Sequence, residues 1–442
     1  MGALHIAFDD TDSRLGRCTT HLAFKLTQKL LRFNAKFVDY PNLIRLNPNI
    51  PWKTRGNGAV CLRVEVNDVR GVVDLVLDTV EQSSAIGTGA NPGVVFYEGE
   101  TIPDEVKSFS SQAMHAVMSK QMAEKIAIKS GVKYSTFGNG QGIVGSLAAL
   151  GCSLIYDDHT FELIGYRQPE NCGSPRIVDK QKVIEFSKKS YPETFNNYDP
   201  INDRILVAPH GPDPVFVGIR GESPDAVSAA RFALGPTEKL EGWTVFRTNQ
   251  GTNMHLRNEL VIADIKAYVA GIVHCTVHSK PEVGAGGHVY FMVEQAGLTM
   301  PAAVYEPTGL YEIACKLLPG DLVEIGCGVR KGTSKHPKIL NVEYLRILQV
   351  TRVFEYSNPQ CLSCGKRMKS EGRGKGFQCS KCKYRDPKAT KVETLLHRDL
   401  KAGLYVPVAT AHRHLTKPLH RYGKEKKSIG KSSPISEFLF MA

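Results

Sequence analysis

Two pairs of cysteines near the end of the chain constrain its fold more than any other feature. Cys361 and Cys364 form one CxxC pair, Cys379 and Cys382 form another, and fourteen residues separate the pairs. Each pair presents two thiolates from one tight turn, and two such turns complete a tetrahedral Zn²⁺ shell. A redox dithiol needs only one pair. The spacing therefore predicts a structural zinc ribbon with no ligand position left for a catalytic water.

The remaining cysteines and the hydrophobic residues show no pattern of an exported or membrane protein. The other seven cysteines are scattered, as buried thiols in a reducing compartment usually are. No run of about 18 apolar residues occurs, and the first residues do not resemble a secretory signal. We therefore expect a cytoplasmic protein that has no membrane partner.

Upstream of the cysteines the sequence becomes strand-rich from Ala267 onward. A helical insert at residues 309–316 interrupts the strands. Five strands of this length with one insert predict an OB-fold β-barrel, whose strand face binds single-stranded nucleic acid. Another small barrel is the alternative. The five expected strands are residues 268–278, 288–294, 302–305, 322–329 and 340–348.

Two β-α-β-β-α-β patterns precede the barrel. The first begins with a strand at residues 5–8 and a helix at residues 18–31. The second begins at residue 161, includes a strand at residues 205–209, and follows the ferredoxin-like order. A chain of 442 residues is longer than a single hydrophobic core accommodates, so we predict a multi-domain α+β protein. The expected domains are residues 1–158, 159–262, 263–352, 353–390 and 391–442.

The net charge of +12 is concentrated at the C-terminal end. Residues 355–442 hold 19 Lys and Arg against 7 Asp and Glu, so the first 354 residues are close to neutral. This asymmetry favours a polyanion-binding region, and a solvated tail is the alternative. In residues 391–442, basic side chains alternate with aromatic ones and continue into a Lys-rich run that ends at Lys431. An RNA contact and a flexible arm fit this extension equally well.

Three carboxylates follow the first predicted strand. Asp9, Asp10 and Asp12 lie within four residues, and Thr19 and Thr20 begin the next helix. Carboxylates placed so close together favour a cation, and Mg²⁺ prefers oxygen ligands and substrate phosphates. The helix N-terminus offers N–H groups to a phosphate. A turn in which these residues serve only as caps is the alternative.

Three further polar segments offer candidate contacts. The run Gly138, Asn139, Gly140 precedes a helix and is a candidate anion-binding nest, although it lacks the Lys-Ser/Thr of a Walker motif. The candidate substrate contacts in the other two segments are His210, Asp213, Asn249 and Gln250. A tight turn and a polar loop are the respective alternatives for these segments.

These segments in this order resemble one family. The matching runs are Asp9–Asp12, Cys18–Thr20, Gly138–Gly142, Ala208–Pro214 and Arg247–Thr252, followed by the predicted barrel and ribbon. The chain is similar to the archaeal agmatinylcytidine synthetases of the minor isoleucine tRNA over roughly residues 4–388. The resemblance implies an enzyme that uses ATP and agmatine to convert the wobble cytidine of the CAU anticodon to 2-agmatinylcytidine, so that the tRNA reads AUA instead of AUG.

The resemblance also implies roles for particular residues. It implies a kinase-like N-terminal domain that phosphorylates the cytosine C2 oxygen before the amine of agmatine displaces the phosphate. Asp9, Asp10 and Asp12 would then handle Mg²⁺ and the ATP phosphates. Thr19 matches the threonine that becomes phosphorylated in the family, and Thr20 beside it is chemically equivalent. The target base has to turn out of the anticodon stack to reach such a site.

The sequence leaves two other functions open. A non-enzymatic single-stranded nucleic-acid-binding protein would explain the barrel and ribbon but not the aspartates. A tRNA-modifying enzyme with another small substrate would explain both. Dependence of ATP turnover on tRNA separates the enzyme from the first alternative, and dependence of the product on agmatine separates it from the second.

Overall fold

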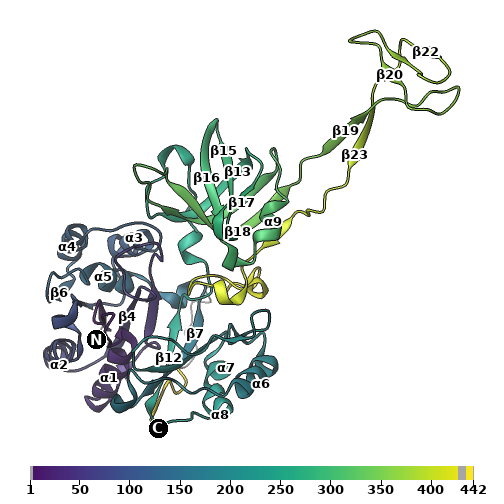
Figure 1. Ribbon diagram of the computed structural model, residues 1–442. Coiled ribbons are helices and arrows are strands. Elements are labelled where there is room, and N and C mark those ends of the chain that lie inside the picture. The colour runs from purple at the N-terminus through teal and green to yellow at the C-terminus, as the bar shows by residue number, and fades with distance from the viewer. Residues whose placement is uncertain (1–2, 427–434, 442) are drawn as a thin grey trace.

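The computed structural model describes residues 3–426 and 435–441. They form a broad α/β body, a β-barrel beside it, and a small cysteine-bearing unit at the end of an extended stalk (Figure 1). Within these residues no helix is long and apolar enough to cross a bilayer.

The first half of the body is built around strand β1. β1 (Leu4–Asp9) lies between β4 (Gly58–Glu65) and β5 (Gly93–Glu98), antiparallel to both. Its alternate side chains serve two cores: Ile6 and Phe8 face one core, and Ala7 faces the other. β1 is buried on both faces because helices cover the sheet on both sides.

The helices of this half divide between the two faces. α1 (Thr19–Arg32) and α2 (Val69–Ser83) contribute to the core that contains Ile6 and Phe8. The other core contains side chains of α3 (Asp104–Ala113), α4 (Lys120–Lys129) and α5 (Ile143–Gly151). β2 (Lys36–Phe37), β3 (Asn42–Arg45) and β6 (Lys133–Thr136) complete the strands of this half. The first predicted pattern is confirmed only in part, because three strands, β2, β3 and β4, lie between α1 and α2 where two were expected.

The second half continues the same eleven-stranded sheet. Its strands are β7 (Thr160–Arg167), β8 (Thr194–Phe195), β11 (Val215–Gly221) and β12 (Leu240–Thr248). Its helices are α6 (Lys180–Ser190), α7 (Pro224–Ser228) and α8 (Ala230–Leu234). The halves join where β12 runs parallel to β3, with Arg247 opposite Asn42. Nine strands follow the order β6-β5-β1-β4-β3-β12-β7-β11-β8, and the other two are β2, which pairs with β4, and β25 (Leu439–Met441), which pairs with β12.

One strand of the second pattern was misplaced by the sequence prediction. The region expected as a strand at residues 205–209 forms only β10 (Arg204–Ile205), which pairs with β9 (Tyr198–Asp199) outside the large sheet. The edge of the sheet is formed by the short β8 instead. β8 has only two residues, too few to show a period-two pattern in the sequence.

A closed five-stranded barrel follows the body, as predicted. Its strands run in the order β13-β17-β18-β16-β15, and β13 pairs with β15 to close it. The helical insert α9 (Tyr311–Cys315) also lies where it was expected. The bounds are β13 (Ala270–Val277), β15 (Val289–Gln295), β16 (Leu298–Val304), β17 (Leu322–Arg330) and β18 (Ile339–Gln349).

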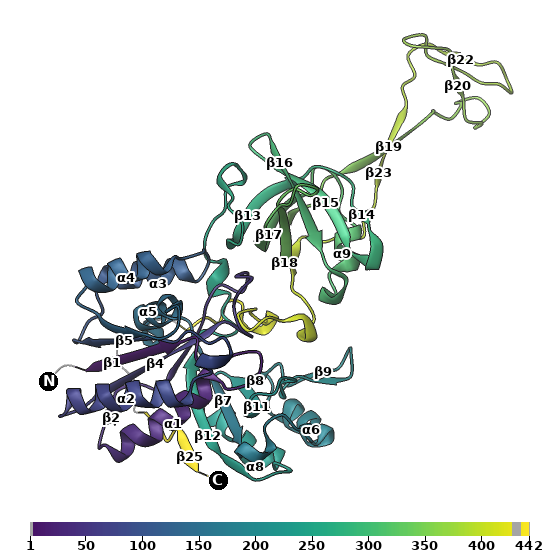
Figure 2. The same cartoon turned by 60° about the vertical axis from the view of Figure 1, so that its left-hand side comes forward.

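The four patterned cysteines lie at the far end of a two-stranded stalk. The stalk is formed by β19 (Val353–Ser357) and β23 (Val392–Leu396), and it extends away from the barrel in both views (Figures 1 and 2). Beyond it, β20 (Lys369–Ser370), β21 (Phe377–Gln378) and β22 (Arg385–Asp386) form a small sheet. Its core is small and includes Met368 and Phe377 between the cysteines.

The C-terminal extension packs onto the rest of the protein, so the flexible-arm interpretation is wrong for its described part. β24 (Gly403–Tyr405) adds to β18 of the barrel, and β25 (Leu439–Met441) adds to β12 of the large sheet. Between them, Arg421 is 1% exposed and forms ion pairs with Asp158 at 2.9 Å and with Glu222 at 2.6 Å. The Lys-rich run lies partly in residues 427–434, outside the described residues.

Candidate functional site

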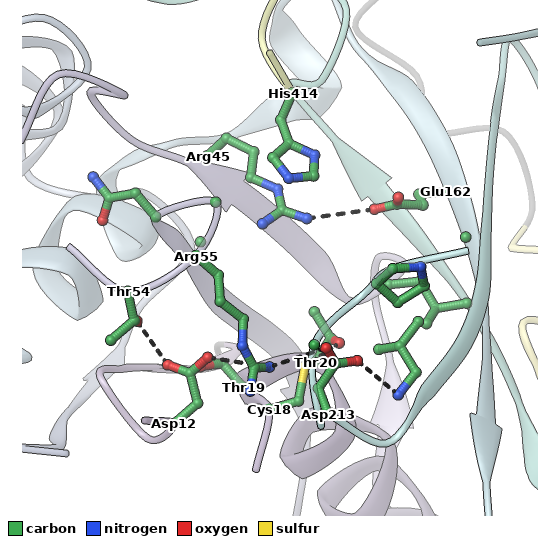
Figure 3. Close-up of a pocket in the computed structure, with 18 of the residues that line it drawn as sticks. Asp12, Cys18, Thr19, Thr20, Arg45, Thr54, Arg55, Glu162, Asp213 and His414 are labelled. Carbon is green, nitrogen blue, oxygen red and sulfur yellow. Dashed lines mark hydrogen bonds and ion pairs between the residues drawn. The ribbon is translucent and has the colours of Figure 1, made fainter. Parts of the chain in front are cut away.

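A cavity of about 670 Å³ opens at the junction between the two halves of the large sheet. Its lining comes from chain segments far apart in sequence: the region after β1, the region around β3, strands β7 and β11, the loop before β11, and the C-terminal segment. Figure 3 shows charged side chains entering it from opposite walls. A site of this kind can hold a polar ligand against several fixed charges.

Asp12 lies on one wall of this cavity. Its carboxylate accepts a 2.8 Å hydrogen bond from Thr54 Oγ1 and lies 3.4 Å from the guanidinium of Arg55. Arg55 also approaches Asp213 at 3.9 Å, and Arg176 pairs with Asp213 at 3.2 Å. Burial raises the pKa of Asp12, and Arg55 opposes that rise. The predicted residues Asp12 and Asp213 are therefore brought together, with Arg55 between them (Figure 3).

Thr19 and Thr20 begin helix α1 at the same wall. The first N–H groups of an α-helix have no partner within the helix. In α1 the side chain of Cys18, at the N-cap, does not accept from them either. Thr11 donates a 3.0 Å hydrogen bond to Thr19 Oγ1, and Thr20 Oγ1 lies 3.1 Å from Cys18 Sγ. The helix end thus presents N–H groups and two hydroxyls to the cavity, an arrangement that stabilises a phosphate.

Asp9 and Asp10 line a second, smaller cavity of about 100 Å³ that shares Lys53, Thr54 and Asn57 with the first. Burial raises the pKa of Asp9 to about 8, and repulsion from Asp10 adds to the rise. Burial likewise raises the pKa of Asp10 to about 6. A cation beside them would favour the charged form of both carboxylates.

The three aspartates do not form one ligand set in the structure. Within residues 3–426 and 435–441, only the four cysteines bring three or more ligand atoms within 4.8 Å of one another. Asp9 and Asp10 belong to the small cavity and Asp12 to the large one, because the backbone turns at Asp10 through a left-handed conformation (φ 57°). The shared wall around Thr54 connects the two cavities.

The glycine-rich loop at residues 138–142 lies beside Asp10, and Asn91 connects the two. The backbone N–H of Asn91 donates to Asp10 Oδ2 at 3.2 Å. The Asn91 side-chain oxygen accepts from the N–H of Asn139 at 3.0 Å, and its carbonyl accepts from Gly142. These loop N–H groups therefore donate to Asn91, and Asn91 donates to Asp10. The loop thus helps to hold the Asp10 side chain in place.

Gly138 and Gly140 give this loop its shape. Their backbone angles φ are 60° and 71°, values that strongly favour glycine. Lys120 Nζ donates a 2.6 Å hydrogen bond to the carbonyl of Asn139, which places an ammonium group on the loop. The same ammonium group lies 3.7 Å from the carboxylate of Glu124.

The opposite wall of the large cavity is organised around Glu162 on β7. Arg45 approaches its carboxylate at 3.8 Å, Arg220 approaches it at 3.4 Å, and the Gln250 amide donates to it. His414 Nδ1 lies 2.8 Å from Gln250 Oε1 and 3.0 Å from Arg220 Nη2. Three side chains from separate segments thus contact one carboxylate, and His414 contacts two of the three. Figure 3 shows the pair of Arg45 with Glu162.

The remaining predicted contacts lie outside the cavity lining. Asn249 is fully buried and binds the backbone of Arg45 in both directions, at 2.8 and 2.9 Å, so it fixes β3 beside β12. Gln250 is also buried and acts through Glu162 and His414. His210 is exposed, and its Nε2 lies 2.9 Å from Arg204. The structure therefore does not bring His210 to Asp12.

The cysteine cluster meets the requirements of a structural metal site. Cys361 Sγ and Cys382 Sγ lie 3.5 Å apart, as do Cys364 Sγ and Cys379 Sγ. All four sulfur atoms lie within 4.8 Å of one another. Four sulfur ligands at this spacing fit a tetrahedral Zn²⁺ ion and leave no open position.

Several lining residues were missed by the sequence analysis. Glu162 lies between Phe161 and Leu163 on β7, and Arg45 follows Leu43 and Ile44 on β3, so a charge beside buried apolar residues is a signal that could have identified both. Arg220 is likewise the only charged residue of its strand, β11, whereas Arg55 lies in a loop and had no comparable signal. His414 lies in the extension, where nothing in the local sequence distinguishes it from His412 or His420.

Three family models match the chain. They are described as the TiaS TCKD domain at residues 5–71, the TiaS FLD domain at residues 140–255, and the TiaS C-terminal zinc ribbon domain at residues 358–400.

Similar proteins match over nearly the full chain. TiaS of Cenarchaeum symbiosum, a 2-agmatinylcytidine synthetase of isoleucine tRNA, is 42% identical over 96% of this chain and 94% of its own length. TiaS of Pyrococcus horikoshii is 40% identical over 97% and 99%, respectively. A solved complex of TiaS with its isoleucine tRNA and ATP is 34% identical, with a TM-score of 0.83 over 95% of this chain and 98% of that one. A complex of TiaS with the same tRNA, AMPCPP and agmatine is 32% identical, with a TM-score of 0.81 over the same shares.

Proposed function

The chain belongs to the TiaS family of isoleucine-tRNA 2-agmatinylcytidine synthetases, and from this premise we propose that it joins agmatine to the wobble cytidine of the minor isoleucine tRNA in an ATP-dependent reaction. The observation that carries the proposal is the large cavity. It brings Asp12, Thr19 and Thr20 together with Glu162 and Arg45 at the junction of the two sheet halves. The modified tRNA would read the codon AUA instead of AUG.

The chemistry requires activation before the amine attacks. The 2-oxo group of cytosine is a poor leaving group, and transfer of a phosphoryl group from ATP to that oxygen makes it a good one. The amine of agmatine then attacks C2 and phosphate leaves. The N–H groups at the start of α1 and the hydroxyls of Thr19 and Thr20 are suited to hold the phosphates during this transfer. Thr19 is also the proposed site of phosphorylation.

Asp9, Asp10 and Asp12 are the proposed catalytic carboxylates. A hard divalent cation fits Asp9 and Asp10, because their raised pKa values reflect two buried carboxylates without a compensating charge. Mg²⁺ bound there would neutralise charge on the transferring phosphoryl group. Gly138, Asn139 and Gly140 are proposed to border the phosphates, with Lys120 supplying the positive charge.

The proposal also covers the fold type and the borders of each domain. We propose a kinase-like domain at residues 1–158 and a ferredoxin-like domain at residues 159–262, supported by the strand order β12-β7-β11-β8. The barrel at residues 263–352 is proposed to be an OB-fold. The ribbon at residues 353–390 and the extension at residues 391–442 complete the division. The barrel and ribbon would hold the tRNA mainly through its phosphates, in the cytoplasm.

His210, Asp213, Asn249 and Gln250 differ in what they contribute to this proposal. Asp213 lines the large cavity and is a proposed substrate contact. Asn249 and Gln250 are proposed to act on substrate only through Arg45, Glu162 and His414. The role of His210 as a direct contact has no support from its exposed position.

The test is mass spectrometry of nucleosides from the minor isoleucine tRNA incubated with the protein, ATP, Mg²⁺ and agmatine. Wild type is expected to convert cytidine to the agmatine adduct, and Asp10→Ala is expected to lose at least about 10³-fold in rate because a catalytic carboxylate is removed. Glu100→Ala, an exposed carboxylate outside both cavities, is the matched control. A tRNA that binds wild type but keeps its mass would favour the non-enzymatic nucleic-acid-binding alternative.

A further inference from the structure

The loop at residues 48–57 borders both cavities and carries an exposed tryptophan. Trp52 lines the small cavity, and its neighbour Lys53 lines both. Trp52 is 58% exposed, whereas tryptophan is highly buried on average. The other tryptophan of the chain, Trp243, is 6% exposed. The proposed metal and phosphate contacts give no reason for an open indole at this position.

Asparagine side chains hold this loop in place. Asn47, which is fully buried, donates from Nδ2 to the carbonyl of Tyr268 at 2.8 Å and accepts from the N–H of Asn49 at 3.0 Å. Asn57 closes the loop, because its Nδ2 donates to the carbonyl of Asn47 at 2.9 Å. The indole is thus presented by a hydrogen-bonded loop, so a ligand that stacks on it orders little additional chain.

One face of the indole is free to stack. The ring of Tyr268 meets that of Trp52 edge to face, with the centroids 6.2 Å apart and an angle of 77° between the planes. Such a T-shaped contact covers at most one face of the indole, and the exposure of Trp52 shows that the ring is open to solvent. Tyr268 lies two residues before β13, where the chain enters the barrel. The free face therefore lies at the joint between the body and the barrel.

Lys53 and Arg413 place positive charge on the same rim. In the described part of the chain Lys53 has no acidic partner, and its Nζ donates to the carbonyl of Arg55 at 3.0 Å. Burial and the nearby guanidinium of Arg413 lower the pKa of Lys53. Arg413 is held by Asn49 Oδ1 at 2.8 Å and by Glu343 of β18 at 3.1 Å. Lys53 thus faces a second cation without a carboxylate of its own, an arrangement that a phosphate would stabilise.

An open indole next to an ammonium group without an acidic partner matches one nucleotide, whose base stacks on the ring and whose phosphate accepts from the cation. RNA and ATP both offer these groups, and two features favour RNA. Trp52 contacts Tyr268, and Glu343 of the barrel holds Arg413, so the rim lies between the barrel and the catalytic body. In addition, Lys53 and Arg413 both line the large cavity, which is the proposed location of the target base.

We propose that Trp52 and Lys53 form a subsite for the nucleotide next to the target cytidine: the base of this nucleotide stacks on Trp52, and its phosphate lies against Lys53 and Arg413. The inference rests on the proposed function, because it requires the target base to enter the large cavity. A base that turns out of the anticodon stack leaves its neighbour without one stacking partner, and the indole replaces that lost contact.

Intrinsic fluorescence tests the stacking directly, because Trp52 is the exposed one of only two tryptophans. The full chain is titrated with the minor isoleucine tRNA and, separately, with ATP and Mg²⁺. The tRNA is expected to quench the emission. Trp52→Phe, which leaves buried Trp243 as the only emitter, is expected to abolish the change. Quenching by ATP alone, or quenching by tRNA that persists in Trp52→Phe, overturns the proposal.

The affinity for altered tRNAs identifies the nucleotide. Trp52→Ala is expected to weaken tRNA binding about tenfold, the usual effect of removing one stacked base, and to leave the KM for ATP unchanged. Two further tRNAs carry an abasic site on the 5′ or the 3′ side of the target cytidine. One of them is expected to lose the same factor with wild type and nothing further with Trp52→Ala. Phe232→Ala is the matched control, because Phe232 is 80% exposed and lines neither cavity.

Salt dependence tests the phosphate contact. Lys53→Met is expected to reduce the slope of log Kd for tRNA against log salt concentration by about one, because one contact to a phosphate is lost. Lys125→Met removes an exposed lysine that lines neither cavity, and it is expected to keep the wild-type slope. Equal slopes for wild type and Lys53→Met would place the phosphate elsewhere and refute this part of the subsite.

The outcomes separate the two proposals. If wild type does not convert cytidine to the agmatine adduct, the proposed function fails. If wild type converts cytidine but Trp52→Ala, shown by thermal melting to be folded, binds every tRNA as wild type does, the function stands and the subsite is refuted. A loss in Trp52→Ala that is shared with one abasic tRNA supports the inference.

Discussion

The cavity at the junction of the sheet halves and the cysteine cluster at the end of the stalk are built in opposite ways. The cluster draws its four ligands from residues 361–382, a single short stretch of chain. The cavity draws Asp12, Glu162, Arg220 and His414 from segments spread over almost the whole sequence. A local site depends on its own turns and its metal, whereas a dispersed site depends on the packing of everything between its residues. Perturbations of the two regions should therefore have different consequences.

Gly145→Ala should have the largest effect on the dispersed site. A Cβ atom at residue 145 would lie 1.7 Å from Asp9 Oδ2, so the carboxylate has to move. Displacement of a catalytic group by about 1 Å costs about 10²-fold in rate, and we expect at least that loss in kcat. Gly87→Ala is the control, because no atom lies within 4 Å of a Cβ there. Equal activity of the two variants would contradict the placement of Asp9.

Arg421→Met should destabilise the body that holds the dispersed site. The change removes the shortest ion pairs of buried Asp158 and partly buried Glu222 and leaves them only longer ones, to Lys417 at 3.9 Å and to Lys426 at 3.6 Å. Breaking a buried pair costs about 3–5 kcal/mol. Urea unfolding measures the loss. Lys424→Met, at an exposed position in the same segment, is expected to change the free energy of unfolding by less than about 0.5 kcal/mol. A small effect of Arg421→Met would mean that the extension is not anchored as described.

Cys379→Ser should disrupt the local site alone. It removes one of four sulfur ligands, so we expect loss of Zn²⁺ and of the small core around Phe377, with the melting of the body unchanged. Residues 358–388 hold nine Lys and Arg against two Asp and Glu, so tRNA affinity should fall about tenfold and depend less on salt. Cys315→Ser, at an exposed cysteine outside the cluster, is the control. A parallel loss of body stability would show that the two regions are coupled.

Asp9→Asn should change the melting temperature by an amount that depends on pH. The pKa of Asp9 is raised from 3.8 to about 8, so the folded state binds its proton more tightly than the unfolded state. Without a cation, stability is therefore highest below pH 4 with respect to this group and is lost as pH rises toward 8. Asp9→Asn removes that loss, so the variant should melt above wild type at pH 9 and close to it at pH 4.

Melting in the presence of Mg²⁺ tests in addition whether the Asp9 carboxylate binds a cation. It should raise the melting temperature of wild type at pH 9 and leave Asp9→Asn nearly unchanged, because only the carboxylate binds a cation strongly. A difference between the two proteins that does not vary with pH would contradict the raised pKa of Asp9.

The sequence by itself determined the features that are encoded locally. The spacing of Cys361, Cys364, Cys379 and Cys382 is enough to specify a four-sulfur site, because two tight turns supply all of the ligands. The strand-rich stretch from Ala267 onward predicted the five barrel strands, and the run from Asp9 to Asp12 marked the end of β1 as a polar site. In each case the relevant residues are near neighbours in the chain.

Only the tertiary structure decided which distant side chains meet. The parallel pairing of β3 with β12 places Arg45 beside Glu162, and the C-terminal segment adds His414 to the same wall. The sequence left that segment open between an RNA contact and a flexible arm, because the partners of its buried Arg421 lie 199 and 263 residues earlier. Such contacts depend on how the sheet, barrel and extension pack, and no local pattern of residues encodes that packing.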